Sequence, residues 1–305
     1  MYDVIIVGGG PAGLSAGQVL GRARRRVLVC DAGHPRNAAS RAVHGFLTRD
    51  GASPQELRRL GRQELARYGV QFLPVRVTSA CALPEERRHG LRTAFRLELQ
   101  NGRALLSRKL LLATGVDDVL PEIEGLRQFY GTSVHHCPYC DGWEHRDQQL
   151  AALGPGNAAI GLALSLRTWS EHVLACTHGA DLGPEDRQRA KRNGIAIREE
   201  RVVRLEGPGT ALQRIVFEGG PPCACDALFL NTGQFQRSDL PALLGCEFKE
   251  GRHVRVRRRQ RTRVQGLYMA GDAVGEVQFA IVAAAEGATA ALAMNRELQD
   301  EDRGE

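Results

Sequence analysis

The sequence contains no run of about 18 apolar residues, the length that a helix needs to cross a bilayer. It also lacks the basic start and small-residue cleavage site of a secretory signal, because Tyr2 to Val7 leads straight into a glycine turn. We therefore expect a cytoplasmic protein without membrane contact. In a reducing compartment its eight cysteines are not expected to form a structural disulfide framework.

Aromatic residues are scarce, at 5% of the chain, and no helix-turn-helix, zinc finger or aromatic-rich basic patch accompanies the formal net charge of +6. The densest basic run, Arg255 to Arg263, begins with alternating arginine and valine, which favours a strand with one solvated face followed by a charged loop. An acidic partner is the alternative for this run. The sequence gives no support to a nucleic-acid ligand.

The N-terminal stretch is typical of a dinucleotide-binding strand, turn and helix. Gly8, Gly10 and Gly13 follow an apolar strand in the spacing G-x-G-x-x-G and open an alanine- and leucine-rich helix. These glycines permit a tight turn, close approach of a pyrophosphate, and close contact between helix and strand. The next predicted strand, Val27 to Cys30, ends on Asp31, 23 residues after Gly8 (31 minus 8). Its carboxylate is placed to accept hydrogen bonds from ribose hydroxyls.

The same pattern returns in the middle of the chain, 146 residues later (154 minus 8). An apolar strand, Leu150 to Leu153, precedes the second fingerprint and a predicted helix from Ile160 to Trp169. The second fingerprint comprises Gly154, Pro155, Gly156, Asn157, Ala158 and Ala159. The sequence thus predicts an α/β protein with two Rossmann-like nucleotide-binding domains.

The C-terminal part contains a short strand that ends in Gly271 and Asp272, then a predicted helix from Ala280 to Met294, but no third glycine fingerprint. We interpret it as the return of the chain to the first domain. The second domain, residues 117–236, is then inserted into the first, residues 1–116 and 237–305. The acidic tail from Asp300 to Glu305 is expected to fray.

The residue that follows the second nucleotide-binding strand bears on the choice of nucleotide. Thr177 lies 23 residues after Gly154 (177 minus 154), so no carboxylate stands where it would repel a 2′-phosphate, which favours NADPH over NADH. A basic cluster shortly afterwards can supply cations for that phosphate, or it can form a solvated helix face. The cluster comprises Arg187, Arg189, Lys191 and Arg192.

A Cys-x-x-Cys pair, Cys137 and Cys140, lies before the second fingerprint. Two thiols at this spacing can close a small ring, and one thiolate can be stabilised by its partner and by local dipoles, which favours redox chemistry. The alternatives are two unreactive cysteines or a metal half-site with His135 and His136. A structural zinc site would need a second pair, and the spacing of Cys223 and Cys225 does not fit, so no metal is predicted.

Asp141 directly follows the pair and is a candidate acid that delivers a proton to a departing thiolate. His145 is a rival acid, and a solvated turn aspartate beside Gly142 is the third interpretation. The remaining single cysteines are expected in the core. They are Cys30, Cys81, Cys176 and Cys246.

In the order of these motifs the chain resembles the low-molecular-weight thioredoxin reductase family over nearly its whole length. The resemblance implies FAD in the two-segment first domain, a pyridine nucleotide in the inserted domain, and a homodimer. It implies that Cys140 faces the flavin while Cys137 attacks a substrate disulfide such as that of thioredoxin. FAD would be held by Gly8, Gly10, Pro11, Ala12, Gly13, Asp31, Gly115, Gly271, Asp272, Gln278, Phe279 and Ala280, and the nucleotide by Gly154, Gly156, Asn157 and Ala158.

Two departures from the family pattern leave the function open between related chemistries. The family's His-Arg-Arg stretch is replaced here by Cys176 to Ala180. The segments Arg36 to Phe46 and Trp143 to His145 resemble a divergent branch that includes dithiol oxidases of disulfide-containing natural products and reductases with unusual electron donors. We expect an NADPH-dependent disulfide reductase, with a small-molecule dithiol oxidase, a reductase with another donor, and a non-catalytic redox sensor as alternatives.

Overall fold

The structure is a computed structural model that describes residues 1–84, 93–249, 253–275 and 277–304. The chain divides into two compact units. Unit 1 consists of Met1–Ala38, Gly45–Asp117 and Phe235–Glu305, and unit 2 consists of Ala39–His44 and Asp118–Gln234. The chain therefore passes from one unit to the other near Asp117 and returns near Gln234, and a short early segment also belongs to unit 2.

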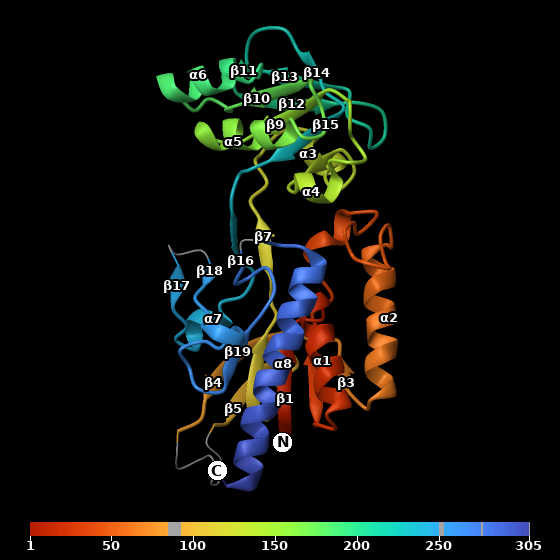
Figure 1. The fold of residues 1–305 in the computed structure, drawn as a ribbon, viewed down its shortest axis with the longest axis vertical. Helices are drawn as coiled ribbons and strands as arrows, with labels where there is room; N and C mark the ends of the chain where they lie inside the picture. The colour runs from red at the N-terminus through yellow and green to blue at the C-terminus, as the bar shows by residue number, and fades with distance from the viewer. Residues whose placement is uncertain (85–92, 250–252, 276, 305) are drawn as a thin grey trace. The chain divides into compact units, whose positions relative to one another are not determined.

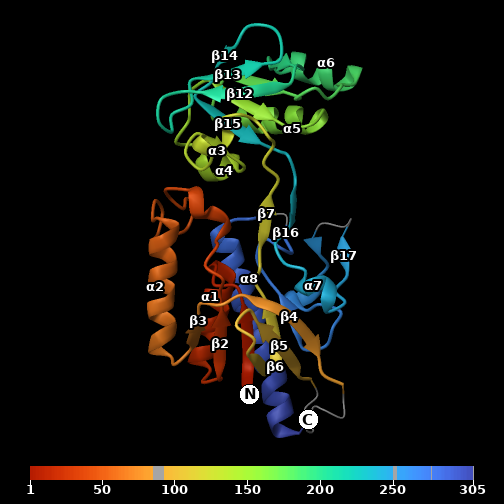
Figure 2. The same ribbon diagram turned by 180° about the vertical axis from the view of Figure 1, so that it is seen from behind.

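Unit 1 is built on a seven-stranded sheet in the order β3-β2-β1-β6-β5-β4, with β19 also paired to β6. Strands β1, β2, β3, β6 and β19 run parallel, whereas β4 and β5 form an antiparallel extension. Figure 2 shows this extension from behind. The strands are β1 Tyr2–Val7, β2 Val27–Cys30, β3 Gln71–Leu73, β4 Val77–Ala82, β5 Phe95–Leu99, β6 Ala104–Leu112 and β19 Leu267–Met269.

Small side chains set the packing of helices α1 (Pro11–Arg22) and α8 (Ala280–Arg303), which lie side by side over one face of the sheet (Figure 1). A Cβ added at Gly287 in α8 would lie 2.0 Å from the Ala12 carbonyl oxygen in α1, so the backbones approach too closely for a larger residue. Helix α2 (Pro54–Arg67) packs on α1 through Leu65 against Gly17. Val4 and Ile6 of β1 meet these helices, while Ile5 faces the opposite core.

Helix α8 corrects one expectation, because it continues to Arg303 instead of fraying from Asp300. Ion pairs hold its last turn: Glu301 contacts the buried Lys109 of β6, and Arg108 contacts both Glu301 and Asp302. Charged partners on a central strand thus outweigh the expected fraying of an acidic terminus. Glu305 lies outside the described residues.

Unit 2 contains a five-stranded parallel sheet in the order β11-β10-β9-β15-β8. Its strands are β8 Val134–His135, β9 Leu150–Leu153, β10 Val173–Cys176, β11 Ala196–Arg198 and β15 Ala227–Leu230. Its helices are α3 Leu126–Phe129, α4 Pro138–Asp141, α5 Asn157–Leu166 and α6 Pro184–Arg192. A three-stranded sheet joins β12 Val202–Glu206, β13 Arg214–Phe217 and β14 Cys223–Ala224. The α/β class with parallel nucleotide-binding sheets, predicted from the sequence, is confirmed.

Short elements complete the chain. Strands β7 (Val116–Asp118) and β16 (Gln234–Gln236) pair where the chain passes between the units. Unit 1 also holds α7 Leu240–Leu243, β17 Phe248–Lys249, β18 His253–Val254 and the 3-10 turn Arg258–Gln260, and a second 3-10 turn spans Arg36–Ala39. The strand expected from Arg255 onward is wrong, because β18 ends at Val254 and positive φ angles at Arg259 and Gln260 form a turn. No helix within the described ranges is long and apolar enough to cross a membrane.

Candidate active site

The first glycine turn, between β1 and α1, has the shape that a phosphate-binding turn requires. Gly8 has a φ of +114°, and an added Cβ there would lie 2.1 Å from the Ala113 carbonyl oxygen. An added Cβ at Gly13 would lie 1.9 Å from the carbonyl oxygen of Gly8. A Cβ at Gly10, by contrast, meets no heavy atom within 4 Å. Gly8 and Gly13 thus allow close packing, while Gly10 leaves open space beside the N-terminus of α1.

Pro11 and Ala12 begin the helix behind this open space. Pro11 is the first residue of α1, where its missing N–H costs nothing. Ala12 is buried, and an added Cβ at Gly271 would lie 3.2 Å from the Ala12 side chain. The turn after β19 therefore lies against the start of α1.

Asp31 lies at the carboxyl end of β2, next to the same turn, as its place in the sequence predicts. Its Oδ2 would lie 2.8 Å from a Cβ at Gly9. Two arginines of α2, which no sequence motif predicts, donate to that oxygen: Arg58 Nη2 at 2.7 Å and Arg62 Nη2 at 3.2 Å. An ionised carboxylate has about four lone-pair sites, so Asp31 retains capacity for a ribose hydroxyl.

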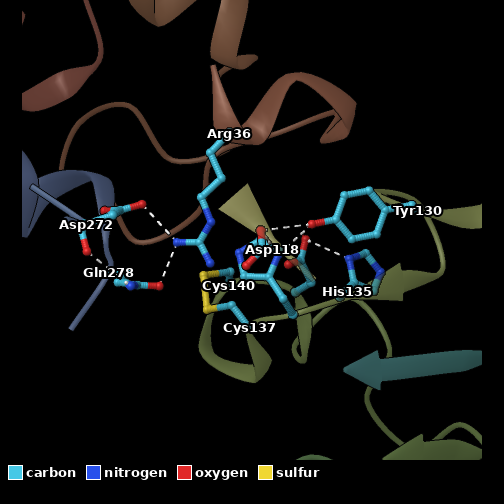
Figure 3. Close-up of a disulfide and its surroundings, with 10 residues drawn as sticks. Arg36, Asp118, Tyr130, His135, Cys137, Cys140, Asp272 and Gln278 are labelled. Carbon is cyan, nitrogen blue, oxygen red and sulfur yellow. Dashed lines mark hydrogen bonds and ion pairs between the residues drawn. A yellow bond between two sulfur atoms is a disulfide. The ribbon is translucent and has the colours of Figure 1, made fainter. Parts of the chain in front are cut away.

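The turn after β19 and the start of α8 form a polar cluster at this edge of the sheet. Arg36 Nη1 donates to Asp272 Oδ2 at 2.9 Å and to Gln278 Oε1 at 2.6 Å (Figure 3). Glu286 Oε2 accepts from the Gly271 N–H at 2.7 Å, and burial raises the pKa of this carboxyl. Glu286 was not predicted, and Arg36 was predicted only as part of a divergent segment, since neither residue belongs to a glycine motif.

The remaining predicted residues of unit 1 lie around these turns. Gly115 follows β6 with a φ of +69° and open space at its Cβ position. Phe279 and Ala280 are the capping residue and the first residue of α8. Three buried polar atoms at this edge have no hydrogen-bond partner in the described part of the chain: Thr114 Oγ1, Arg58 Nε and Arg62 Nε. Open space and unsatisfied buried polar atoms are what a nucleotide cofactor would complete, so these residues fit FAD.

The second glycine turn, between β9 and α5, repeats the first. A Cβ at Gly154 would lie 2.8 Å from the Asn231 carbonyl oxygen, and Gly156 caps α5 with a φ of +53°. Asn157 and Ala158 are the first residues of α5, and Ala159 is fully buried against the sheet. The helix N-terminus therefore stands at the end of β9, where a nucleotide phosphate would bind.

Two of the residues expected to bear on the choice of nucleotide, Thr177 and Arg187, have other partners. Thr177 is fully buried, and its hydroxyl donates to the Ala180 carbonyl oxygen at 2.7 Å. Arg187 forms a two-point ion pair with Glu199, with Nη2 to Oε2 at 2.8 Å. His178 accepts the Val202 N–H on Nδ1, and burial and Arg201 lower its pKa, which favours the neutral ring. Thr177 and Arg187 therefore lend the preference for NADPH no support.

Cys137 and Cys140 form a disulfide across the start of α4 (Figure 3). Cys137 caps the helix and Pro138 is its first residue, while the N–H groups of Cys140 and Asp141 donate to the Cys137 carbonyl oxygen. A Cβ at Gly142 would lie 2.5 Å from the Pro138 carbonyl oxygen and 2.8 Å from the Trp169 ring. Glycine is thus required directly after Asp141, so that the turn can pack on Trp169.

Asp141 lies at one end of a chain of side chains that continues through two histidines. Its Oδ1 is 3.3 Å from His135 Nδ1, and His135 Nε2 is 3.0 Å from His145 Nε2. His145 Nδ1 in turn is 3.0 Å from Gln148 Oε1. His135 is 5% exposed and packs on Phe229 of the neighbouring strand. Asp141 and His145, predicted from the sequence as rival acids, are connected in the structure through His135.

A second polar cluster also borders the disulfide turn. Tyr130 donates to Asp118 Oδ2 at 3.1 Å (Figure 3). The Tyr130 hydroxyl is also 3.3 Å from His136 Nδ1. His135 and His136 therefore point to different partners and do not converge on one metal. Within the described ranges no group of three or more His, Cys, Asp or Glu side chains is arranged to hold a metal ion.

Most other cysteines are buried, which suppresses thiolate formation. Burial raises the pKa of Cys30 to about 12 and that of Cys246 to about 11, and it also raises the pKa values of Cys176 and Cys225. Cys81 is exposed, contrary to the expected core position. It lies on β4, whose outward side chains face solvent at the edge of the sheet.

Comparison with known proteins decides the family. The model of the pyridine nucleotide-disulphide oxidoreductases matches residues 2–287. The chain belongs to this family. A probable thioredoxin reductase of Arthroderma benhamiae is 32% identical over 98% of this chain and 81% of the relative. This pyridine nucleotide-disulphide oxidoreductase is therefore an enzyme, and the predicted resemblance to thioredoxin reductases is confirmed.

Solved structures of similar proteins cover the whole chain. The crystal structure of HlmI matches with a TM-score of 0.94 and 36% identity, covering 99% of this chain and 94% of that one. A putative thioredoxin reductase TrxB from Bacillus anthracis matches with a TM-score of 0.91 and 30% identity, covering 99% and 100%. The oxidoreductase is thus thioredoxin reductase-like, and its family implies FAD and a pyridine nucleotide as cofactors.

Proposed function

We propose that this oxidoreductase reduces a substrate disulfide at Cys137–Cys140, with electrons that come from a reduced pyridine nucleotide. One observation carries the proposal: the disulfide closes on the first turn of α4, directly before a carboxylate that continues into a hydrogen-bonded histidine chain. A redox couple and a proton donor thus stand together. Bound FAD would supply the two-electron couple that opens this disulfide, and the nucleotide would supply hydride.

Cys137, Cys140 and Asp141 each have a separate role in reduction of the substrate disulfide. The Cys137 thiolate attacks one sulfur of the substrate disulfide and releases the first substrate thiolate. The Cys140 thiolate then attacks the Cys137 sulfur, which restores the Cys137–Cys140 disulfide and releases the second. Asp141 supplies a proton to a departing thiolate. In balance, one disulfide, two electrons and two protons give two thiols.

We further propose that unit 1 holds FAD and unit 2 holds the pyridine nucleotide, as the two glycine turns suggest. Gly10 and the start of α1 would receive the FAD pyrophosphate, with Asp31 at the ribose. Gly156 and the start of α5 would receive the nucleotide phosphates. Because unit 2 carries both the disulfide and the nucleotide turn, each must reach the flavin in turn, with β7 and β16 as the hinges. A thioredoxin-like protein is the proposed substrate, and a homodimer the proposed assembly.

The direction of electron flow is tested by anaerobic stopped-flow mixing of the oxidised holoenzyme with NADH and with NADPH. Rapid loss of the oxidised-flavin absorbance with at least one nucleotide is expected. A flavin that neither nucleotide reduces would contradict the proposal. Cys137→Ser should abolish turnover, retain flavin and show thiolate-to-flavin charge-transfer absorbance. The appearance of that band in Cys140→Ser instead would reverse the two cysteine roles.

A second candidate is oxidation of a small-molecule dithiol, and the surface beside the disulfide favours it. Tyr139, between the two cysteines, is 72% exposed, and Trp143 is 65% exposed. Exposed aromatic groups at a reactive disulfide suit a small apolar substrate. This candidate predicts that a dithiol plus oxygen gives peroxide while NADH and NADPH leave the flavin oxidised.

A further inference from the structure

The chain Asp141, His135, His145 and Gln148 links the disulfide turn to the more exposed side of unit 2. The two ends of the chain differ in burial: His135 of β8 is buried with its ring against Phe229, whereas the contact between His145 and Gln148 is exposed. Each imidazole is contacted at both ring nitrogens. A ring held in this way can take up a proton at one nitrogen and release another proton from the second nitrogen.

The hydrogen bonds allow two complementary proton arrangements. In one, His145 donates from Nδ1 to Gln148, His135 donates from Nε2 to His145, and Asp141 is protonated and donates to His135 Nδ1. In the other, Asp141 is ionised and accepts from His135 Nδ1, His145 donates from Nε2, and the Gln148 amide turns to donate. The two arrangements differ by one proton, carried on Asp141 in the first and returned to solvent in the second.

We propose that His135 and His145 are positioning residues that form a proton path between solvent and Asp141 during thiol–disulfide exchange at Cys137–Cys140. The proposal rests on the proposed function. A proton enters at His145 Nδ1, the Nε2 proton of His145 passes to His135 Nε2, and the Nδ1 proton of His135 passes to Asp141. Each ring gains one proton and loses one, and Asp141 passes its proton to the departing substrate thiolate.

The charges around the path are compatible with proton transfer in both directions. Burial lowers the pKa of His145, and the facing His135 lowers it further, while Gln148, Asp141 and Glu144 raise it. The lowered pKa disfavours the charged form of His145, so the ring does not readily hold an extra proton. Arg146, the neighbour of His145 in the chain, turns to the Trp143 ring and carbonyl oxygen.

The test uses two probe disulfides. They differ in how strongly the thiolate that each one releases requires a proton. 5,5′-Dithiobis(2-nitrobenzoate) releases a stable aromatic thiolate, whereas bis(2-hydroxyethyl) disulfide releases a basic alkyl thiolate. Holoenzyme reduced anaerobically with dithionite is mixed with each probe, and the return of oxidised-flavin absorbance gives the rate. His145→Ala should slow the reaction with the alkyl probe by on the order of tenfold and leave the aromatic probe within about twofold. Added imidazole should restore the alkyl rate.

The control variant is His172→Gln, since His172 is an exposed histidine of the same unit that takes no part in the path. It should react with both probes like the parent. If His145→Ala lost rate equally with both probes, or lost no rate with either, the proton path would be overturned. The proposed function would still stand in that case, because the parent enzyme reduces the probes. Failure of the parent with both probes would contradict the proposed function and the path together. His135→Gln should repeat the selective loss without rescue, because the site is buried.

Discussion

Arg58 donates to Asp31 across 2.7 Å from Nη2 to Oδ2, at the point where β2 ends beside the first glycine turn. Both side chains are largely buried, at 14% and 13% exposure. The acidic residue at the end of the second strand is therefore held by a cation from α2 before any ribose reaches it. Because a buried carboxylate without its partner is costly, the arginine fixes both the charge and the orientation of Asp31.

Arg58→Gln should weaken FAD binding, because Asp31 loses a charge-assisted hydrogen bond and with it a fixed position. We expect the dissociation constant for FAD to rise on the order of tenfold, the effect of losing about 1.5 kcal/mol. Fluorescence titration of cofactor-stripped protein with FAD measures this. Arg59→Gln is the matched control on the same helix, since Arg59 is exposed and contacts Glu56. Equal affinities in the two variants would show that Arg58 does not support this site.

Alanine at Gly13 and alanine at Gly10 of the first turn should affect different properties, the first stability and the second FAD binding. Gly13→Ala places a methyl group 1.9 Å from the Gly8 carbonyl oxygen, so it should lower the free energy of unfolding by about 1–3 kcal/mol with or without FAD. Gly10→Ala meets no protein atom and should leave the cofactor-free protein equally stable. It should nonetheless weaken FAD binding, because the methyl group enters the space proposed for the pyrophosphate. Denaturant titration and FAD titration separate the two effects. Unchanged FAD affinity in Gly10→Ala would place the pyrophosphate elsewhere.

A structural feature can be predicted from the sequence when the residues that form it are close together in the chain. The glycine turns, the strand that ends on Asp31 and the Cys137–Cys140 turn are set by neighbouring residues, so motif spacing finds them. Arg58 lies 27 residues from Asp31 and Arg36 lies 236 residues from Asp272, and no motif connects such pairs. The link from His135 to His145 likewise depends on where β8 and the turn after α4 meet. The sequence motifs therefore predict the turns but not the contacts that depend on tertiary packing.

Arg187 offers a test of the nucleotide, because its ion pair with Glu199 leaves it poorly placed for a 2′-phosphate. A charge-assisted hydrogen bond to that phosphate would be worth about 1.5–3 kcal/mol, or at least about tenfold. Without one, we expect kcat/KM for NADPH and NADH to differ by less than about tenfold. Initial rates of nucleotide oxidation with the two donors give the ratio. Arg187→Ala should leave it unchanged, and a large preference for NADPH that this variant abolishes would contradict the expectation.

His145 should contribute to the pH dependence of the free energy of unfolding. Burial is the main reason that its pKa in the folded protein lies below the ordinary value of about 6.5. The unfolded state therefore binds a proton first as the pH falls below about 6.5, and the free energy of unfolding should decrease there and be constant for this group above it. Urea denaturation between pH 5 and pH 8 measures the slope. His145→Gln should flatten it, and His178, whose pKa is also lowered, accounts for part of what remains. A variant with the parent's slope would exclude His145 as its source.

Lys109 and Glu301 form the ion pair that ties the end of α8 to β6, with exposures of 1% and 5%. Removing one member of a buried ion pair leaves the other charge buried without that partner. Glu301→Gln should therefore lower the free energy of unfolding by on the order of 3 kcal/mol, even though Glu297 lies 3.4 Å from the same ammonium group. The matched change Glu98→Gln breaks an exposed pair with Arg96 and should cost less than about 1 kcal/mol. Denaturant titration of both variants gives the two values. If the two variants lost the same free energy of unfolding, the last turn of α8 would not depend on the ion pair with Lys109. The preceding turns of the helix would then be what keeps it helical.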